Sequence, residues 1–150
     1  VSNFEESDLN HFITGRGFIE DELGNKKRVS PSVLTKTTLL YEASLIFQQG
    51  TFFPADMFRK TGGFNTDNCS CWDLELFVDL TSIGLKHLVL PSNLATFRVH
   101  GNSITGSGKL QNLYRLDMDK LFHRFFHRNK NLLDWSYSYF LRAIRLVRPF

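Results

Sequence analysis

Alternating apolar and polar positions near the start of the chain predict a pair of short strands. The alternation runs through HFITGRGFIEDELGNKKRV, residues 11–29, and a Gly-Asn pair between its two halves supplies the turn. Residues 44–53, SLIFQQGTFF, form a second β-rich run. Pro54 then begins a short helix that ends at a Gly-Gly pair, because proline suits the first turn of a helix and glycine commonly follows its end.

Apolar residues next recur at helical spacing. The spacing predicts a second helix from Trp72 to Ser82, closed by Gly84. Its expected inner face consists of Trp72, Leu76, Leu80 and Ile83. The stretch SPSVLTKTTLLYEA, residues 30–43, fits either a loop or a short helix.

The last third of the chain continues with a strand and then helices. Residues 86–100 predict a strand, and GNSITGSGK, residues 101–109, predicts a loop. This loop lacks the lysine that a phosphate-binding loop needs directly after its second glycine, where Ser107 stands. From Leu110 the pattern is helical, with a break near 129–131. The order of elements predicts an α/β fold without the usual glycine-rich start of a nucleotide-binding unit.

Composition is that of a compact folded chain. The 150 residues are close to the usual size of one domain, and 42% are hydrophobic, including 15 Phe, which excludes a disordered protein. No apolar run approaches the roughly 20 residues that span a bilayer, and residues 1–10 lack the features of a signal peptide. Cys69 and Cys71 are too close to join distant segments, so we expect reduced thiols and a cytoplasmic location.

Charge divides the chain unevenly. Residues 1–108 hold 9 basic and 12 acidic residues, whereas residues 109–150 hold 9 basic and 3 acidic ones among many aromatics. The second segment therefore suits either a peripheral membrane helix, on the inner face of a membrane, or terminal helices packed on the domain. A nucleic-acid partner is not expected, because the chain shows no known binding signature for one.

The ordered segments LIFQQGTFF, KTGGFN, CWDLELFVDL and LATFRVHGNSITG, within about residues 12 to 106, resemble a known family. They are similar to the C-terminal, acceptor-side half of family 2 glycosyltransferases, inverting enzymes with the A-type fold. The resemblance implies a partial A-type catalytic domain over 1–108, followed by a basic helical segment over 109–150. It also implies a nucleotide-sugar donor and a carbohydrate or lipid-linked acceptor.

The resemblance assigns roles to particular residues. Asp73 matches the family's catalytic base, and His100 matches a histidine that contributes to the metal site in many relatives. Residues matched to substrate binding are Gln48, Gln49, Thr51, Trp72, Glu75 and Arg98. The complete enzyme would use Mn²⁺ or Mg²⁺ to neutralise the leaving diphosphate.

The chemistry explains why a carboxylate is wanted at Asp73. In an inverting transfer the acceptor hydroxyl attacks the anomeric carbon while the nucleoside diphosphate leaves, so a base must lie within reach of that hydroxyl. Taken by itself, however, Ser70-x-x-Asp73 also resembles a capping box of an ordinary helix start. Both interpretations are open from this segment alone.

The metal-site residues are less defined. His100 fits a metal ligand or a structural histidine about equally well, since it precedes a loop. Asp117-Met118-Asp119 has the family's Asp-x-Asp spelling, but it lies in a helical pattern and is expected to be a solvated helix surface. Residues 20–22, Glu-Asp-Glu, are expected to keep the hairpin soluble rather than bind a metal.

In the family, the nucleotide pocket and the Asp-x-Asp precede the segments matched here. We therefore expect a fragment that is inactive alone, and self-association into a homodimer is one way to cover its exposed apolar surface. The alternative is a non-catalytic module that binds a membrane surface or a partner through 109–150.

Overall fold

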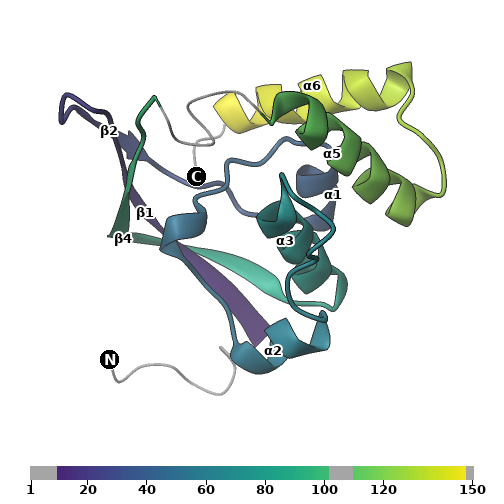
Figure 1. Ribbon diagram of the computed structural model, residues 1–150, viewed down its shortest axis with the longest axis horizontal. Coiled ribbons are helices and arrows are strands. Elements are labelled where there is room, and N and C mark those ends of the chain that lie inside the picture. Colours follow the sequence, from purple (N-terminus) through teal and green to yellow (C-terminus); the bar gives the residue numbers. More distant parts are fainter. Residues whose placement is uncertain (1–9, 102–109, 148–150) are drawn as a thin grey trace.

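The structure is a computed structural model that describes residues 10–101 and 110–147. It shows a mixed α/β arrangement with one sheet and most of the helices grouped beside it (Figure 1). The elements in chain order are β1 (His11–Glu20), β2 (Lys26–Val29), α1 (Lys36–Leu40), η2, a short 3-10 helix (Gln48–Gly50), β3 (Thr51–Phe52), α2 (Ala55–Lys60), α3 (Trp72–Ser82), β4 (Lys86–Arg98), α5 (Gln111–Phe126) and α6 (Leu132–Val147).

Strand β1 organises the four-stranded sheet. Along one edge it pairs antiparallel with β2 and with β3, and along the other it pairs parallel with β4. The β1–β4 register runs from His11↔Lys86 to Glu20↔Arg98, with a shift at Arg16. Because a parallel pair needs a long crossover connection, the helices between β1 and β4 are carried to the sheet's face.

Two glycines of β1 allow close packing at this register shift. A Cβ atom at Gly17 would lie 2.2 Å from the carbonyl oxygen of Ala95 and 2.3 Å from the Phe47 ring. A Cβ at Gly15 would lie 2.3 Å from the Leu94 side chain. Glycine is therefore required at Gly17 in particular, because a backbone carbonyl cannot turn aside as a side chain can.

The core lies between the sheet and helices α1, α3 and α5. The rings of Phe12 and Phe77 stack with centroids 5.8 Å apart and join β1 to α3. Full burial of a Phe or Leu side chain contributes about 1.5–3 kcal/mol, so this cluster is the main source of stability. Its completely or almost completely buried members include Phe12, Leu39, Leu40, Leu76, Phe77, Val78, Leu80, Met118, Leu121 and Phe122.

Most of the expected elements are present. The hairpin, the helix from Trp72 to Ser82, the strand after it and the paired terminal helices are confirmed, and residues 36–40 form the short helix α1. The break between α5 and α6 begins at His127, whose φ of 53° ends α5 in the left-handed conformation. The expected loop over 101–109 lies almost entirely outside the described residues.

Two expectations were wrong. Residues 44–53 form a 3-10 turn and a two-residue strand instead of a longer strand, because Gly50 packs tightly between the Phe47 ring and the backbone of β1. The inner face of α3 was also misplaced: Trp72 and Ile83 are exposed. Helix α3 is packed by the sheet, α1 and α5, so a wide arc of it is buried, including Leu74, Glu75, Leu76, Phe77, Val78 and Leu80.

Candidate functional site

A cleft of about 860 Å³ opens where the start of α3 meets α5 and α6. Asp73 lies in its wall, together with the loop after α1. The cleft is polar and aromatic as well as apolar. Its lining residues are Glu42, Ile46, Ser70, Cys71, Asp73, Leu74, Leu110, Gln111, Tyr114, Arg115, Met118, Asp119, Lys130, Trp135 and Arg142.

Asp73 is held in an unusual setting for a helix-start acid. Its Oδ1 accepts a hydrogen bond of 2.8 Å from the backbone N–H of Leu74, and no ion pair to it is found among the described residues. Burial raises the pKa of this carboxyl above its ordinary value. A carboxylate that is desolvated and not neutralised by a cation is a stronger proton acceptor than a solvated one.

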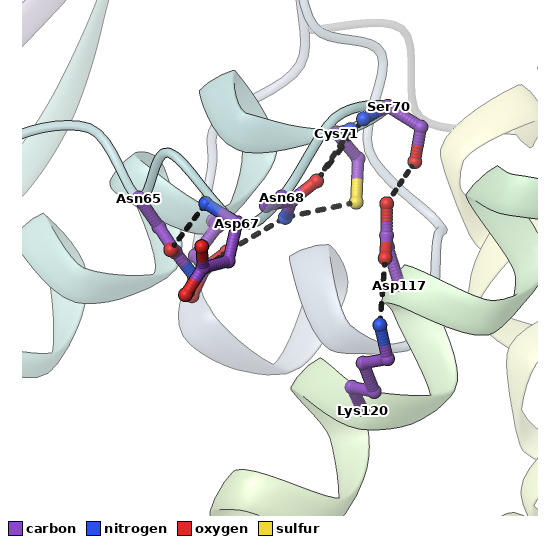
Figure 2. A network of polar contacts seen from close by, with 8 residues as sticks. Asn65, Asp67, Asn68, Ser70, Cys71, Asp117 and Lys120 are labelled. Atoms are coloured by element: carbon purple, nitrogen blue, oxygen red, sulfur yellow. Dashed lines mark hydrogen bonds and ion pairs between the residues drawn. The ribbon is translucent and has the colours of Figure 1, made fainter.

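Ser70 does not form the capping box with Asp73 that the sequence allowed. Its hydroxyl donates a 2.6 Å hydrogen bond to Oδ2 of Asp117 on α5 (Figure 2). The N-cap residue of α3 is Cys71, which makes no side-chain cap bond. The capping box with Ser70 is therefore absent, although Asp73 is an acid of the first turn of α3, and Asp73 lines the cleft.

Glu75 does not line the cleft but belongs to a hydrogen-bond network around the loop that precedes α3. Its carboxylate accepts hydrogen bonds from Asn65 at 3.2 Å, Asn68 at 2.6 Å and Arg124 at 2.8 Å. Asn68 also accepts from the backbone N–H groups of Ser70 and Cys71, so the network fixes the loop that leads into α3. Figure 2 shows part of this network beside Asp117 and Lys120. Glu75 lines a separate cavity of about 200 Å³ and is satisfied by the protein itself.

The Asp-Met-Asp segment of α5 divides between the two cavities. Asp117 is buried and also accepts from Lys120 at 3.3 Å, whereas Asp119 is exposed and lines the Asp73 cleft. The expectation of a solvated surface was correct for Asp119 and wrong for Asp117. Residues two apart on a helix point in different directions, so the pair cannot act as one ligand set.

Two cations in the wall of the cleft are partly neutralised. Lys130 pairs with Glu42 at 2.8 Å and lies 5.5 Å from the centre of the Trp135 ring. Arg142 donates to the backbone carbonyl of Glu42 at 3.1 Å. Burial raises the pKa of Tyr114, so its hydroxyl stays protonated and can donate a hydrogen bond. The cleft therefore offers a base, hydrogen-bond donors and an aromatic ring to a polar ligand.

Four of the residues matched to substrate binding lie elsewhere. Gln48 and Gln49 belong to η2. Thr51 donates to the carbonyl of Phe47 at 2.9 Å and contacts Thr14 within the protein. Trp72 is partly exposed and packs edge-on against Phe64, with ring centroids 4.8 Å apart. None of these four lines the cleft, although Trp72 directly precedes Asp73.

Arg98 and His100 lie at and just after the end of β4. The Arg98 guanidinium pairs with Glu20 at 2.7 Å and, with Lys26, lowers the pKa of that carboxyl. His100 is exposed. Over residues 10–101 and 110–147, no three or more His, Cys, Asp or Glu side chains group closely enough to hold a metal ion. Cys69 and Cys71 are free thiols.

Much of the cleft was not foreseen from the sequence, yet a signal was present. The α5 residues in its wall are Gln111, Tyr114, Arg115, Met118 and Asp119. They occur at i, i+3, i+4, i+7 and i+8, which is one face of a helix. A face that mixes an aromatic, an amide and two charges is neither a plain core face nor a uniformly charged one. Its contact with Asp73 depends on the packing of α5 on α3.

A buried polar chain crosses the sheet near Thr51. The backbone N–H of Leu34 donates to Nδ1 of His87 at 2.9 Å, so the proton lies on Nε2, which donates to Thr14 at 2.8 Å. The Thr14 hydroxyl then donates to Thr51 at 2.9 Å. Burial lowers the pKa of His87 to about 4, and the imidazole is neutral at pH 7. This chain explains the position of Thr51 without a ligand.

Comparison with known protein families finds no match to this chain, and no curated protein matches it either. No helix in the described part of the chain has the length and apolar character needed to cross a membrane.

Proposed function

We propose that the cleft around Asp73 is the acceptor side of a glycosyl-transfer site of the inverting, A-type kind. The observation that carries the proposal is the setting of Asp73: a carboxylate without a cationic partner among the described residues, its pKa raised by burial, in the wall of an 860 Å³ cleft. The resemblance matches this same residue to the family's base.

The proposed role is that of a general base. The acceptor hydroxyl gives its proton to Asp73 as its oxygen bonds to the anomeric carbon of the donor sugar, and the bond to the nucleoside diphosphate breaks. Tyr114 and Gln111 offer hydrogen bonds to neighbouring hydroxyls of the acceptor, and Trp135 offers a ring face. Proper orientation of the attacking hydroxyl accounts for much of such catalysis.

The resemblance also implies Mn²⁺ or Mg²⁺ near His100. The described residues do not fit such an ion by themselves, since no three or more His, Cys, Asp or Glu side chains among residues 10–101 and 110–147 group closely enough to hold one. Hard divalent cations require several oxygen ligands. No step of the proposed mechanism is therefore routed through a metal, and the proposal concerns the acceptor and its base.

Acceptor binding tests the location of the site. Gln111 lines the cleft and Asn112 does not, although both are exposed in the first turn of α5. In calorimetric titrations with a panel of oligosaccharides, Gln111→Trp fills the cleft and abolishes binding, whereas Asn112→Trp binds like the unchanged chain. Equal binding by all three proteins would place the acceptor elsewhere.

A second measurement shows whether Asp73 acts as the general base or only binds the acceptor. Asp73→Asn keeps the size of the side chain but cannot accept the proton. Acceptor affinity stays within about threefold, while any transfer, by the chain alone or with a companion that supplies the donor nucleotide, falls by about 10²–10⁴. Full transfer activity in Asp73→Asn would remove the proposed role.

A further inference from the structure

Helix α6 is oriented with its polar side inward. Asp134 and Ser138 are buried, and both contact Tyr41: its hydroxyl donates to Asp134 at 3.0 Å, and its carbonyl accepts from Ser138 at 2.6 Å. Two arginines of the same side donate to backbone carbonyls of the loop after α1, Arg142 to Glu42 and Arg145 to Ala43, each at 3.1 Å. These polar bonds attach the helix to the domain, together with Leu141, which packs on the core, and Tyr137, whose ring contacts Tyr41 edge-on with ring centroids 4.9 Å apart.

Its solvent side is apolar. The exposed residues there are Leu132 (84%), Leu133, Trp135, Tyr137, Tyr139, Phe140, Ile144 and Leu146 (76%). At 3.6 residues per turn they span about 200° of the helix circumference. Ser136 also lies in this arc, and its hydroxyl donates back to the carbonyl of Leu132 at 3.1 Å. Exposed apolar surface of this extent marks an interaction site.

We propose that this face of α6, residues 132–146, lies in the interface of a lipid bilayer, parallel to its plane. A surface helix on a protein core usually buries an apolar stripe of about 100°. An arc about twice as wide suits a continuous apolar medium better than one flat protein surface. Tyr and Trp, which are abundant in this arc, favour the headgroup region, because their rings are apolar and their polar tips remain hydrated.

The charge around α6 favours an anionic lipid surface over a second copy of the chain. Residues 109–150 hold nine basic residues and three acidic ones. Asp117 and Asp134 are buried and paired with Lys120 and Arg128, so Asp119 is the only acid of α5 and α6 exposed to solvent. Arg124 and Lys130 are also paired, with Glu75 and Asp79 and with Glu42 of other elements, so the excess of positive charge at the surface is smaller than the sequence count. The positive charge that remains favours anionic headgroups over a second, equally charged copy.

The proposal also resolves the two interpretations that the sequence left open for 109–150. Helix α5 contributes Met118, Leu121 and Phe122 to the domain core, so it is a packed helix. Helix α6 is the candidate membrane helix. Its 16 residues suit an in-plane position. This inference does not depend on the proposed sugar transfer, although Trp135 belongs to both the cleft wall and the apolar arc.

Vesicle flotation of the whole chain tests the proposal. The protein is mixed with vesicles of three parts phosphatidylcholine to one part phosphatidylglycerol, and in parallel with pure phosphatidylcholine vesicles. The unchanged chain floats with the anionic vesicles and floats less in high salt. The double variant Leu133→Asp/Phe140→Asp lowers the partition coefficient at least tenfold, while the far-ultraviolet circular dichroism is unchanged because both side chains are exposed.

Leu23→Asp is the matched control. Leu23 is 88% exposed in the turn between β1 and β2, and the substitution adds a carboxylate without touching α6. This variant floats like the unchanged chain. No flotation of the folded, unchanged chain overturns the proposal. So does a concentration-dependent dimer that forms without vesicles and is lost in the double variant, since it would assign the apolar arc to a second copy.

Discussion

The hydroxyl of Ser70 donates a 2.6 Å hydrogen bond to Asp117, and this bond joins the start of α3 to α5. It has a direct effect on the candidate site. The hydroxyl of Ser70 is bonded to α5, so it does not cap α3, and Asp73, which accepts from the backbone N–H of Leu74, lies beside a cleft instead of in a capping box. The same packing brings the polar face of α5 into the wall of the cleft that Asp73 lines.

Two carboxylates of α3 are expected to respond in opposite ways to an amide substitution. Asp73 has a raised pKa, so the folded state holds its proton more tightly than the unfolded state does, and the charged form costs stability at neutral pH. Asp73→Asn therefore raises the free energy of unfolding by about 1 kcal/mol. Glu75→Gln lowers it by about 2 kcal/mol, because Arg124 and the two asparagines lose a charged acceptor.

Urea unfolding at pH 7 measures both changes in one experiment. The two residues lie on the same helix and undergo the same chemical change, so each variant controls for the other. If Asp73→Asn were the more destabilising of the two, Asp73 would be a structural residue and the case for a desolvated functional carboxylate would fail.

His87 is expected to make the protein acid-sensitive above pH 4. Its pKa is lowered to about 4 in the folded state, while an unfolded histidine titrates near 6.5. The unfolded state therefore binds the extra proton between these values, and stability is lost as the pH falls from about 6.5 to about 4. The loss is about 3 kcal/mol from this group.

The pH dependence of urea unfolding checks this, with His87→Gln as the comparison. That variant has a lower free energy of unfolding at pH 7, but this free energy falls less between pH 6.5 and pH 4 than it does in the unchanged chain. Asp134 has a strongly lowered pKa, through Arg128, so its contribution is lost only below its ordinary value near 3.8 and does not overlap with the window of His87. Equal acid sensitivity of both proteins between pH 6.5 and 4 would mean that His87 is solvated and can be charged in the folded state.

The two glycines of β1 are expected to differ in their tolerance of a methyl group. Gly17→Ala places Cβ against the Ala95 carbonyl and lowers the melting temperature strongly, at a cost of about 3 kcal/mol. Gly15→Ala meets the half-exposed Leu94 side chain, whose Cγ and Cδ1 can rotate away but whose Cβ, at 2.9 Å, can yield only by a small shift of β4, so the substitution costs about 2 kcal/mol. Differential scanning calorimetry compares them directly. Similar losses would mean that the β1–β4 register differs from the one described.

The elements that depend on local sequence were predicted well. The Gly-Asn turn, the span from Trp72 to Ser82 and the break between the terminal helices follow from glycine, polar clusters and periodicity. The wide buried surface of α3 could not be predicted from local sequence, because α1 and α5 pack on this helix in addition to the sheet. The run 44–53 reads as a strand from its β-branched and aromatic residues, but the tertiary contact at Gly50 decides its shape.

In the candidate site, too, some residues could be identified from the sequence and others only from the packing of the helices. Asp73 could be singled out by the resemblance, whereas its partners in the cleft come from α5 and α6, which the resemblance does not cover. Thr51, Glu75 and Arg98 have the right residue types for ligand binding, but each is engaged by the protein in hydrogen bonds or ion pairs. Sequence indicates which groups can do chemistry, and packing decides which of them remain available.

The measurement that tests the central claim most directly is a nuclear magnetic resonance titration of the indole N–H signals with oligosaccharides and short-chain lipid-linked analogues. The chain has two tryptophans, Trp135 in the cleft wall and Trp72 outside it. If the acceptor binds beside Asp73, saturable shifts occur at Trp135 and not at Trp72, and Gln111→Trp abolishes them. Shifts confined to Trp72, or none at Trp135 with any ligand, would contradict an acceptor site in this cleft.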